Sequence, residues 1–345
     1  MTAPRTGLVT LGETMGLVSA VETGPLDFAR NFTYGIGGAE SNVAIGVARL
    51  GAPASWLGRV GTDATGDLIE RRLRAEQVRT EAIRDQGFTG LMLKHRRFGT
   101  ALHVDYHRAG SAGSRLSPAD IRADWIESAA VLHVTGITTA LSESAREAVR
   151  HAVALARAAG VTVSVDVNHR SKLWPKEVAG PVLRDLVEQA DIVFAGVEEA
   201  ELVLGCAEGR PMPVPELVRA LADLGPREAV LKDGARGCTA LVDGVPYRVP
   251  ALKVAVVDPV GAGDAFVAGY LAEHLLGGTE SSGCAPRSRP APSRSPSPAT
   301  ARGSPAAPSS TPSPSPRRTS AAERPGPPSP LGRRAPRARA RARSR

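Results

Sequence analysis

Short apolar runs alternate with helical patterns along most of the chain, and this alternation limits the possible folds more than any other feature. Strand-like runs occupy residues 7–11, 55–60, 131–135, 161–167, 191–195 and 228–232. Helical patterns occupy residues 65–77, 142–158, 176–189 and 197–204. Strands that are connected through helices form parallel sheets with helices on both faces. The sequence therefore predicts an α/β fold with a mostly parallel sheet.

Two segments depart from this alternation. Residues 14–35 and 88–108 are mixed in polarity, and they look like half-exposed strands rather than helices. Such strands suit a small β-flap that projects from the main sheet. Because a flap over the carboxyl edge of a sheet can close on a bound molecule, we expect these segments to form a lid.

The composition changes abruptly after residue 278. Residues 281–345 contain 15 of the 28 prolines, 14 arginines, one acidic residue and one large aliphatic residue, Leu331. A segment so poor in apolar side chains cannot build a core, so we expect a disordered tail after a folded domain of residues 1–280. Of the 43 basic and 35 acidic residues, 29 and 34 lie in residues 1–280. The domain is therefore slightly acidic, and the high isoelectric point reflects the tail alone.

The cysteines and the hydropathy of the chain bear on the cellular compartment in which we expect the protein. Three widely spaced cysteines, Cys206, Cys238 and Cys284, argue against a disulfide framework or a structural zinc site and fit a reducing cytoplasm. The sequence begins without an apolar signal region, and no apolar run is long enough to span a membrane. We expect a cytoplasmic protein with no membrane partner.

In the run Asp258-Pro-Val-Gly-Ala-Gly-Asp-Ala-Phe266, Gly261-Ala-Gly-Asp264 lies between a predicted strand at 254–257 and a predicted helix at 265–272. Its small residues let backbone N–H groups approach an anion, and a helix N-terminus favours negative charge. A carboxylate beside such a site, here Asp264, suits a general base that accepts the proton of a hydroxyl attacking a phosphoryl group. The residues alone leave open that Asp264 is only a helix N-cap.

A second run, Gly37-Gly38-Ala-Glu-Ser-Asn42-Val-Ala, precedes the first in the order expected of a pair of signatures. Together they resemble the two signatures of the ribokinase-like (PfkB) family of sugar kinases, over roughly residues 6–278. The resemblance implies a ribokinase-like fold and ATP as the phosphoryl donor. By this resemblance Asp264 is the catalytic base, the anion hole is formed by Gly261, Ala262 and Gly263, and the sugar is contacted by Gly37, Gly38 and Asn42.

The resemblance also implies a nucleotide and metal region. Lys232-Asp-Gly234-Ala-Arg-Gly237 matches a strand-turn segment beside the nucleotide, to which we add Asp258. Without the family the segment reads as a plain β-turn. Mg²⁺ is expected because the charge of the β- and γ-phosphates must be neutralised for transfer. The family's Asn-x-x-Glu metal motif aligns with Gly196-Val-Glu-Glu199, so only Glu199 is retained. A solvated acid at a helix start is the alternative for Glu199.

Two further segments narrow the substrate. Tyr106-His-Arg108 and Asp166-Val-Asn168-His-Arg170 resemble segments of 2-keto-3-deoxygluconate kinases, in which a tyrosine and two arginines take the substrate carboxylate. A guanidinium pairs bidentately with a carboxylate, which a neutral hexose lacks. We therefore expect phosphorylation of 2-keto-3-deoxygluconate to its 6-phosphate, with Tyr106, Arg108 and Arg170 binding the substrate. A kinase for fructose or ribose, with the arginines as surface charges, is the alternative.

The tail supports a hypothesis of a different class. Arginine-rich disorder holds nucleic acid or another polyanion through charge, although this tail has no aromatic residue for base stacking. Its composition, which is rich in Arg, Pro, Ser and Ala, also resembles that of GC-rich DNA translated in a shifted frame. The chain would then be a catalytically impaired, truncated kinase with only non-specific polyanion binding. The family resemblance further implies a homo-oligomer.

Overall fold

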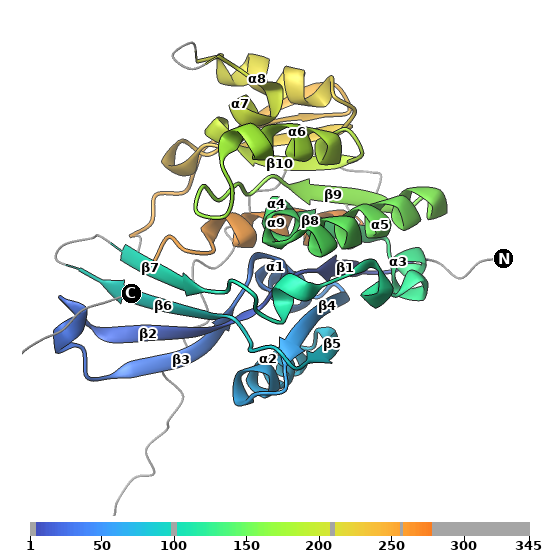
Figure 1. Cartoon of the computed structure of the whole chain (residues 1–345). Coiled ribbons are helices and arrows are strands. Elements are labelled where there is room, and N and C mark those ends of the chain that lie inside the picture. The colour runs from blue at the N-terminus through green and yellow to red at the C-terminus, as the bar shows by residue number, and fades with distance from the viewer. Residues whose placement is uncertain (1–4, 98–101, 208–210, 256–257, 278–345) are drawn as a thin grey trace, which may run out of the picture. The chain divides into compact units, whose positions relative to one another are not determined.

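The structure, a computed structural model, describes residues 5–97, 102–207, 211–255 and 258–277, so the predicted tail at 281–345 lies outside it (Figure 1). Within these residues the largest sheet has nine strands in the order β13-β12-β11-β10-β9-β8-β1-β4-β5. Their bounds are β1 (Leu8–Leu11), β4 (Ala54–Gly61), β5 (Arg79–Asp85), β8 (Val131–Thr135), β9 (Thr162–Asp166), β10 (Ile192–Gly196), β11 (Glu228–Lys232), β12 (Cys238–Val242) and β13 (Val245–Val249). The pairs from β11 to β5 are parallel, and β12 and β13 add an antiparallel edge. The predicted α/β fold with a mostly parallel sheet is confirmed.

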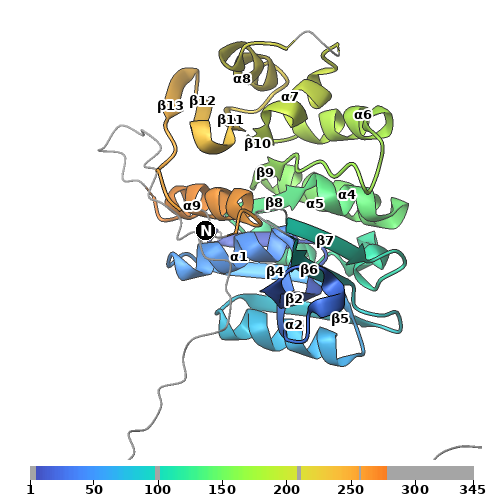
Figure 2. The same cartoon turned by 90° about the vertical axis from the view of Figure 1, so that its left-hand side faces the viewer.

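Helices cover both faces of this sheet (Figure 2). One face carries α1 (Ala39–Arg49), α2 (Ala64–Ala75) and α9 (Ala262–Leu275). The other carries α3 (Ala123–Ser128), α5 (Glu143–Ala159), α6 (Lys176–Val187), α7 (Val197–Leu204) and α8 (Val214–Ala222). The short α4 (Gly136–Leu141) follows β8 directly. Successive strand residues such as Val193 and Phe194 are buried in opposite clusters. This two-sided burial is why the strands read as continuous apolar runs.

A second sheet forms the predicted flap. It contains β2 (Met15–Thr23), β3 (Phe32–Gly37), β6 (Leu91–Arg96) and β7 (Leu102–His107), in the order β3-β2-β6-β7. The flap projects from the main sheet beside α1 and α9, at the left of Figure 1. Most of its side chains are only partly buried, because one sheet of four strands covers little of its own surface. Both segments therefore form half-exposed strands, as their mixed polarity predicts.

The predicted elements around Asp258 need correction. Val254 and Ala255 belong to no strand, and residues 256–257 lie outside the described part of the chain. Helix α9 begins at Ala262, three residues earlier than predicted. The small residues of the Gly-Ala-Gly-Asp run therefore do not form a loop before the helix; three of the four residues build its first turn.

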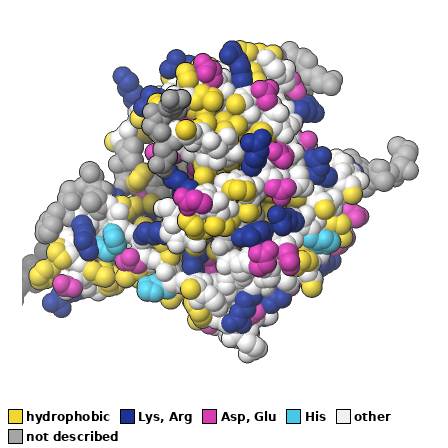
Figure 3. Space-filling view, turned by 45° about the horizontal axis from the view of Figure 1, so that its top comes forward, with side chains coloured by type: hydrophobic (Ala, Val, Ile, Leu, Met, Phe, Trp, Pro, Cys, Tyr) yellow, Lys and Arg dark blue, Asp and Glu magenta, His cyan; other side chains and the backbone are white. Residues whose placement is uncertain are grey.

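Two properties of the described residues bear on whether the protein contacts a membrane or nucleic acid. None of their helices is both long and apolar enough to cross a membrane. Basic and acidic side chains are interspersed over the face shown in Figure 3. That visible face therefore lacks the continuous basic surface that nucleic-acid binding requires.

Candidate active site

The N-terminus of α9 lies at the centre of the predicted site. Gly261 is the N-cap and has φ +82°, a left-handed conformation that glycine adopts without a steric cost. The first amides of a helix have no intrahelical acceptor, so they form a natural anion site. The Ala262 amide donates to the carbonyl of Pro259 at 3.2 Å. That contact leaves the Gly263 and Asp264 amides as the better donors to an anion.

Asp264 occupies the third position of α9 and does not act as its N-cap. Its Oδ2 accepts a hydrogen bond from Nδ2 of Asn42, on α1, at 2.8 Å. The two signature runs thus meet across 222 residues of sequence. Burial raises the pKa of Asp264 to about 6, and the charge of Asp166 adds to the rise, whereas Asn42, Lys232 and Arg170 act against it. A carboxylate with this pKa is ionised at neutral pH and is still basic enough to accept a proton from a hydroxyl.

A buried ion pair lies beside this carboxylate. Nζ of Lys232, at the end of β11, contacts Oδ1 and Oδ2 of Asp166, at the end of β9, at 2.7 and 2.8 Å. Burial acts to lower the pKa of Lys232, but the charges of Asp166 and Glu199 outweigh it and raise the pKa. Lys232 therefore stays protonated. A Cβ placed on Gly263 would lie 3.8 Å from its Nζ, so the ammonium also lies near the α9 anion site.

In the predicted nucleotide segment, Lys232 belongs to an ion pair with Asp166, whereas the residues after it form an exposed turn. After Lys232 the chain forms a tight turn that is closed by the Asp233 amide on the Gly237 carbonyl at 2.8 Å. Gly234 and Gly237 both have positive φ, at 54° and 101°. An ion pair between Asp233 and Arg236 spans the turn at 2.6 Å. The turn is therefore exposed and self-contained, whereas the Lys232 side chain reaches the buried ion pair with Asp166.

Glu199 is the predicted link to the metal. It lies in the first turn of α7, where Oε2 accepts a hydrogen bond from the amide of the N-cap residue Gly196 at 2.7 Å. Burial and the nearby charge of Asp166 raise its pKa, so the side chain is not a solvated one. No group of three metal-ligating side chains occurs among the described residues. Mg²⁺ in kinases is held largely by phosphates and water, with one or two carboxylates, and Asp166 and Glu199 fit that role.

The described partners of Asp258, which we predicted beside the nucleotide, lie on the flap and in its own turn. Its Oδ1 accepts the Val260 amide at 3.0 Å, and its Oδ2 is paired with Lys94 on β6 of the flap. Both side chains are mostly buried. The structure thus places Asp258 against the flap, and the tie joins the chain entering α9 to the lid.

The predicted sugar contacts surround the base of the flap. Gly37 ends β3, and Gly38 is the N-cap of α1. A Cβ on Gly38 would lie 2.4 Å from the carbonyl oxygen of Glu13, so only glycine fits between α1 and the chain leaving β1. This close approach carries Asn42 to Asp264.

Arg108 has a protein carboxylate as its partner, which the sequence did not indicate. Its Nε and Nη2 contact Oε2 of Glu13 at 2.7 and 2.5 Å. The guanidinium also lies 5.9 Å from the ring centroid of Tyr106, a distance that suits a cation–π contact. Tyr106 is exposed, whereas the Arg108 side chain is 10% exposed. The pair fastens the end of β7 to the chain between β1 and β2.

Arg170 is placed differently. It is exposed in the segment after β9, and its charge acts to lower the pKa values of Asp264 and Glu199. Among the described residues it pairs with no carboxylate. Two residues further on, Nζ of Lys172 donates to the Val104 carbonyl of β7 at 3.3 Å and lies 5.9 Å from the Tyr106 ring centroid. This segment therefore contacts the flap, and the charge of Arg170 acts on Asp264.

Glu40 is a buried acid that the sequence did not single out. It lies on α1, its Oε1 accepts hydrogen bonds from Thr135 at 2.6 Å and Thr138 at 2.5 Å, and it is 0% exposed. Burial raises its pKa, and the charge of Arg108 only partly opposes the rise. Glu40 therefore favours the neutral form.

Sequence reasoning also missed Asp166, Glu13 and Lys94. Asp166 carried a usable signal, because a polar residue at the end of a buried parallel strand lies at the ligand-binding edge of the sheet. Glu13 and Lys94 carried no comparable signal. Their importance depends on which charges they meet in space.

The sequence profile of the pfkB family carbohydrate kinases matches residues 5–284. The chain belongs to this family. A 2-dehydro-3-deoxygluconokinase from Bacillus subtilis is 36% identical over 273 residues, which cover 78% of this chain and 83% of that protein. The protein of the same name from Thermoproteus tenax is 37% identical over 279 residues, which cover 79% and 83%. A crystal structure of a PfkB protein from Polaromonas has a TM-score of 0.71 and 36% identity, and it covers 79% of this chain and 89% of that one.

The predicted family and enzyme class are thereby confirmed, and this pfkB-family chain is an ATP-dependent sugar kinase by class.

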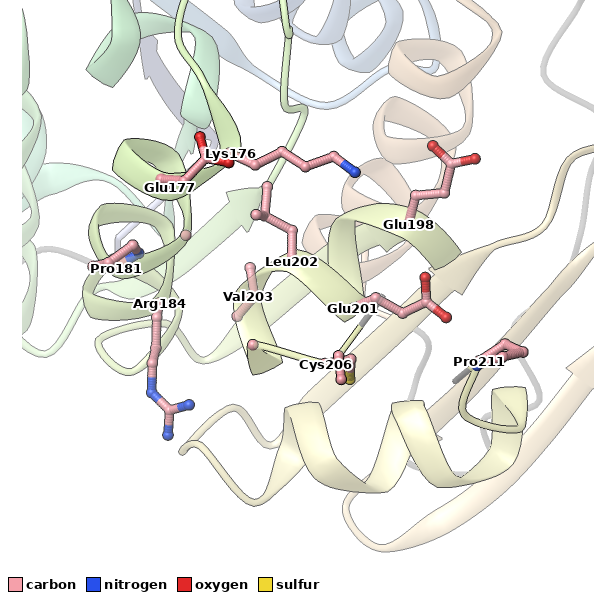
Figure 4. Close-up of a pocket in the computed structure, with 13 residues that line it drawn as sticks. Lys176, Glu177, Pro181, Arg184, Glu198, Glu201, Leu202, Val203, Cys206 and Pro211 are labelled. Atoms are coloured by element: carbon pink, nitrogen blue, oxygen red, sulfur yellow. The ribbon is translucent and has the colours of Figure 1, made fainter. Parts of the chain in front are cut away.

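A hollow of about 620 Å³ lies outside the group of residues around Asp264 (Figure 4). It is formed by α6, α7 and the chain after α7, on the sheet face opposite α9. Its lining mixes the cations Lys176 and Arg184 with the acids Glu177, Glu198 and Glu201. The hollow contains none of the residues grouped around Asp264, so the kinase chemistry is assigned to the α9 site.

Proposed function

We propose that this pfkB-family kinase transfers the γ-phosphoryl group of ATP to the primary hydroxyl of 2-keto-3-deoxygluconate and releases the 6-phosphate and ADP. The observation that carries the proposal is the buried Asp264 carboxylate, which Asn42 holds at the N-terminus of α9. Two relatives that are 36% and 37% identical bear the name 2-dehydro-3-deoxygluconokinase, a synonym for the kinase of this substrate.

The residues around Asp264 can carry out the transfer. Asp264 accepts the proton of the sugar hydroxyl. At the same time the hydroxyl oxygen bonds to the γ-phosphorus, and the bond between the γ-phosphorus and the leaving ADP oxygen breaks. The Gly263 and Asp264 amides and the Lys232 ammonium face the charge on the transferred group. Asp166 and Glu199 would hold Mg²⁺, which supplies neutralisation of the phosphate charge when it is bound.

The sugar acid is favoured by Tyr106, Arg108 and Arg170. Arg170 is exposed in the segment after β9, and its positive charge acts to lower the pKa of Asp264. Guanidinium binds carboxylate in a bidentate geometry. A substrate with a carboxylate at one end and a hydroxyl at the other could then span from Arg170 to Asp264.

A neutral sugar such as fructose or ribose is the second candidate. The observation that favours it is the ion pair between Arg108 and Glu13, because a guanidinium that already has a carboxylate partner is a weaker ligand for another one. The two candidates therefore differ in whether Arg170 and Arg108 can still select an acid.

A coupled ADP-release assay with 2-keto-3-deoxygluconate, fructose and ribose decides between them. We expect the highest kcat/KM for the acid. Arg170→Ala should raise KM for the acid by about tenfold or more, and it should change KM for the neutral sugars little, since only the acid loses a charged partner. An equal effect on acid and neutral sugars would remove the carboxylate argument.

A further inference from the structure

Glu13 lies where the flap joins the main sheet. It is in the chain between β1 and β2, and it is 2% exposed. Its Oε2 accepts hydrogen bonds from both Nε and Nη2 of Arg108, and its Oε1 accepts one from the Ser111 hydroxyl. Both partners follow β7, so one carboxylate gathers the chain that leaves the flap.

The surroundings of Glu13 are shaped to this side chain. A Cβ on Gly113 would lie 2.4 Å from Cγ of Glu13, and a Cβ on Gly90 would lie 2.9 Å from its Oε1. Gly90 precedes β6 and Gly113 follows β7, so two of the crossings between the flap and the main domain pack on the Glu13 side chain. Such close packing fixes the orientation of a buried side chain.

The charges around Arg108 are also defined. Its Nε–Nη2 edge is used by Glu13, which leaves the Nη1 side of the planar group for another acceptor. The second buried acid nearby, Glu40, is hydrogen-bonded to Thr135 and Thr138, and burial raises its pKa. Among the described residues Arg108 is thus paired with Glu13, one cation with one acid.

The other cations near the predicted substrate site differ in whether they have a carboxylate partner. Arg170 is exposed and pairs with no carboxylate among the described residues, and Lys172 contacts a backbone carbonyl of β7. The cations Lys94 and Lys232 are each paired with an aspartate. Of the arginines predicted to bind the substrate, Arg170 is the one that forms no direct ion pair with a carboxylate among the described residues.

We propose that Glu13 is a positioning residue for sugar-acid recognition: it orients Arg108 and cancels its charge, so that Arg108 acts as an aimed hydrogen-bond donor while Arg170 supplies the charge that selects the acid. This inference rests on the proposed function. It assigns a role to a residue that contacts no reacting atom and acts only through Arg108. A residue that only stabilised the fold would affect acid and neutral substrates alike.

A double-mutant cycle tests the proposal. Glu13→Gln keeps the size of the side chain and removes its charge, so Arg108 loses its anchor. We expect KM for 2-keto-3-deoxygluconate to rise about tenfold while kcat changes less than about threefold. In an Arg108→Ala background the same substitution should add less than about twofold to KM, because residues that act as one unit are not additive. Additive effects, or an equal rise in KM for fructose, would overturn the role of Glu13.

A second variant guards against loss of the fold. Arg108→Lys leaves a cation against the buried Glu13 carboxylate and removes the planar fork, so we expect an unchanged Tm but a KM for the acid that is raised about tenfold. An unchanged KM would show that orientation of the guanidinium is irrelevant. Glu188→Gln and Arg184→Ala form the matched control, because this glutamate–arginine pair is 45% exposed on both sides and belongs to α6 and its C-cap, which supply no partner of Glu13 or Arg108. Neither substitution should alter KM.

The outcome for the unsubstituted chain separates the two proposals. If it phosphorylates fructose or ribose but no keto-deoxy acid, the proposed function fails. If it prefers the acid and the cycle is additive, the proposed function stands and the role of Glu13 fails.

Discussion

Asp264 is a carboxylate with two opposing requirements. It is 9% exposed, which disfavours its charged form, yet a general base must be ionised to accept a proton. The Asn42 hydrogen bond and the cations Lys232 and Arg170 offset part of the burial effect, and they hold the pKa at about 6. The sequence alone indicated the residue type and its position before a helix. The balance of burial against charge required the neighbours on α1, β9 and β11.

The pH dependence of activity should report this carboxyl group. Because the pKa of Asp264 is raised to about 6, the base is ionised above that pH and protonated below it. We expect kcat/KM to be flat at neutral pH and to fall toward tenfold per pH unit below about 6. Asp264→Asn should lower kcat about 10²-fold or more and abolish that limb of the profile, with Tm showing an intact fold. Activity that stays flat down to about pH 5 would contradict the assignment.

The flap and helix α9 are coupled by an ion pair at the scale of elements. Lys94 lies on β6, and Asp258 belongs to the chain that enters α9, 164 residues away. Both segments were foreseen: the mixed polarity of residues 88–108 predicted the flap, and the signature run predicted the helix. Their contact was not foreseen, because the pattern along a strand shows which residues share a face but not what that face meets.

Removal of the Lys94–Asp258 ion pair should lower kcat/KM more than it lowers the stability of the fold. Lys94→Met leaves the aliphatic stem in place but leaves Asp258 without its cation, so the flap loses one point of attachment. We expect kcat/KM to fall about tenfold, since small misplacements around a reacting group are costly. Lys253→Met, an exposed lysine in the chain before α9, is the control and should leave kcat/KM unchanged. An equal kcat/KM for the Lys94 variant and the control would show that the tie has no role in turnover.

For the whole molecule, the family match and the charge distribution separate the chain into two parts. The pfkB profile matches residues 5–284, and the described fold ends at Gly277. Beyond residue 280 the sequence has 14 arginines and one acidic residue. The strong positive charge of the chain thus belongs to a segment outside the described residues.

Deletion of residues 285–345 tests that separation. We expect Tm to stay within about 2 °C of the full chain, because the match to the pfkB family ends at residue 284. Binding to heparin should be lost with the segment, and in the full chain it should weaken steeply with salt. A large drop in Tm, or heparin binding that survives the deletion, would show that the segment is part of the fold or that the basic surface lies elsewhere.

The sequence by itself determined the sheet and the flap, and it singled out Asp264 as the candidate base. Alternating strands and helices are local patterns that burial on both faces of a sheet imposes, and the signature runs are contiguous, so both can be seen without a structure. Only the tertiary structure decided the partners of the charged residues. Arg108 meets Glu13 across 95 residues, and Lys232 meets Asp166 across 66. Which opposite charge a side chain meets depends on how distant strands and loops cross, and local periodicity carries no record of that.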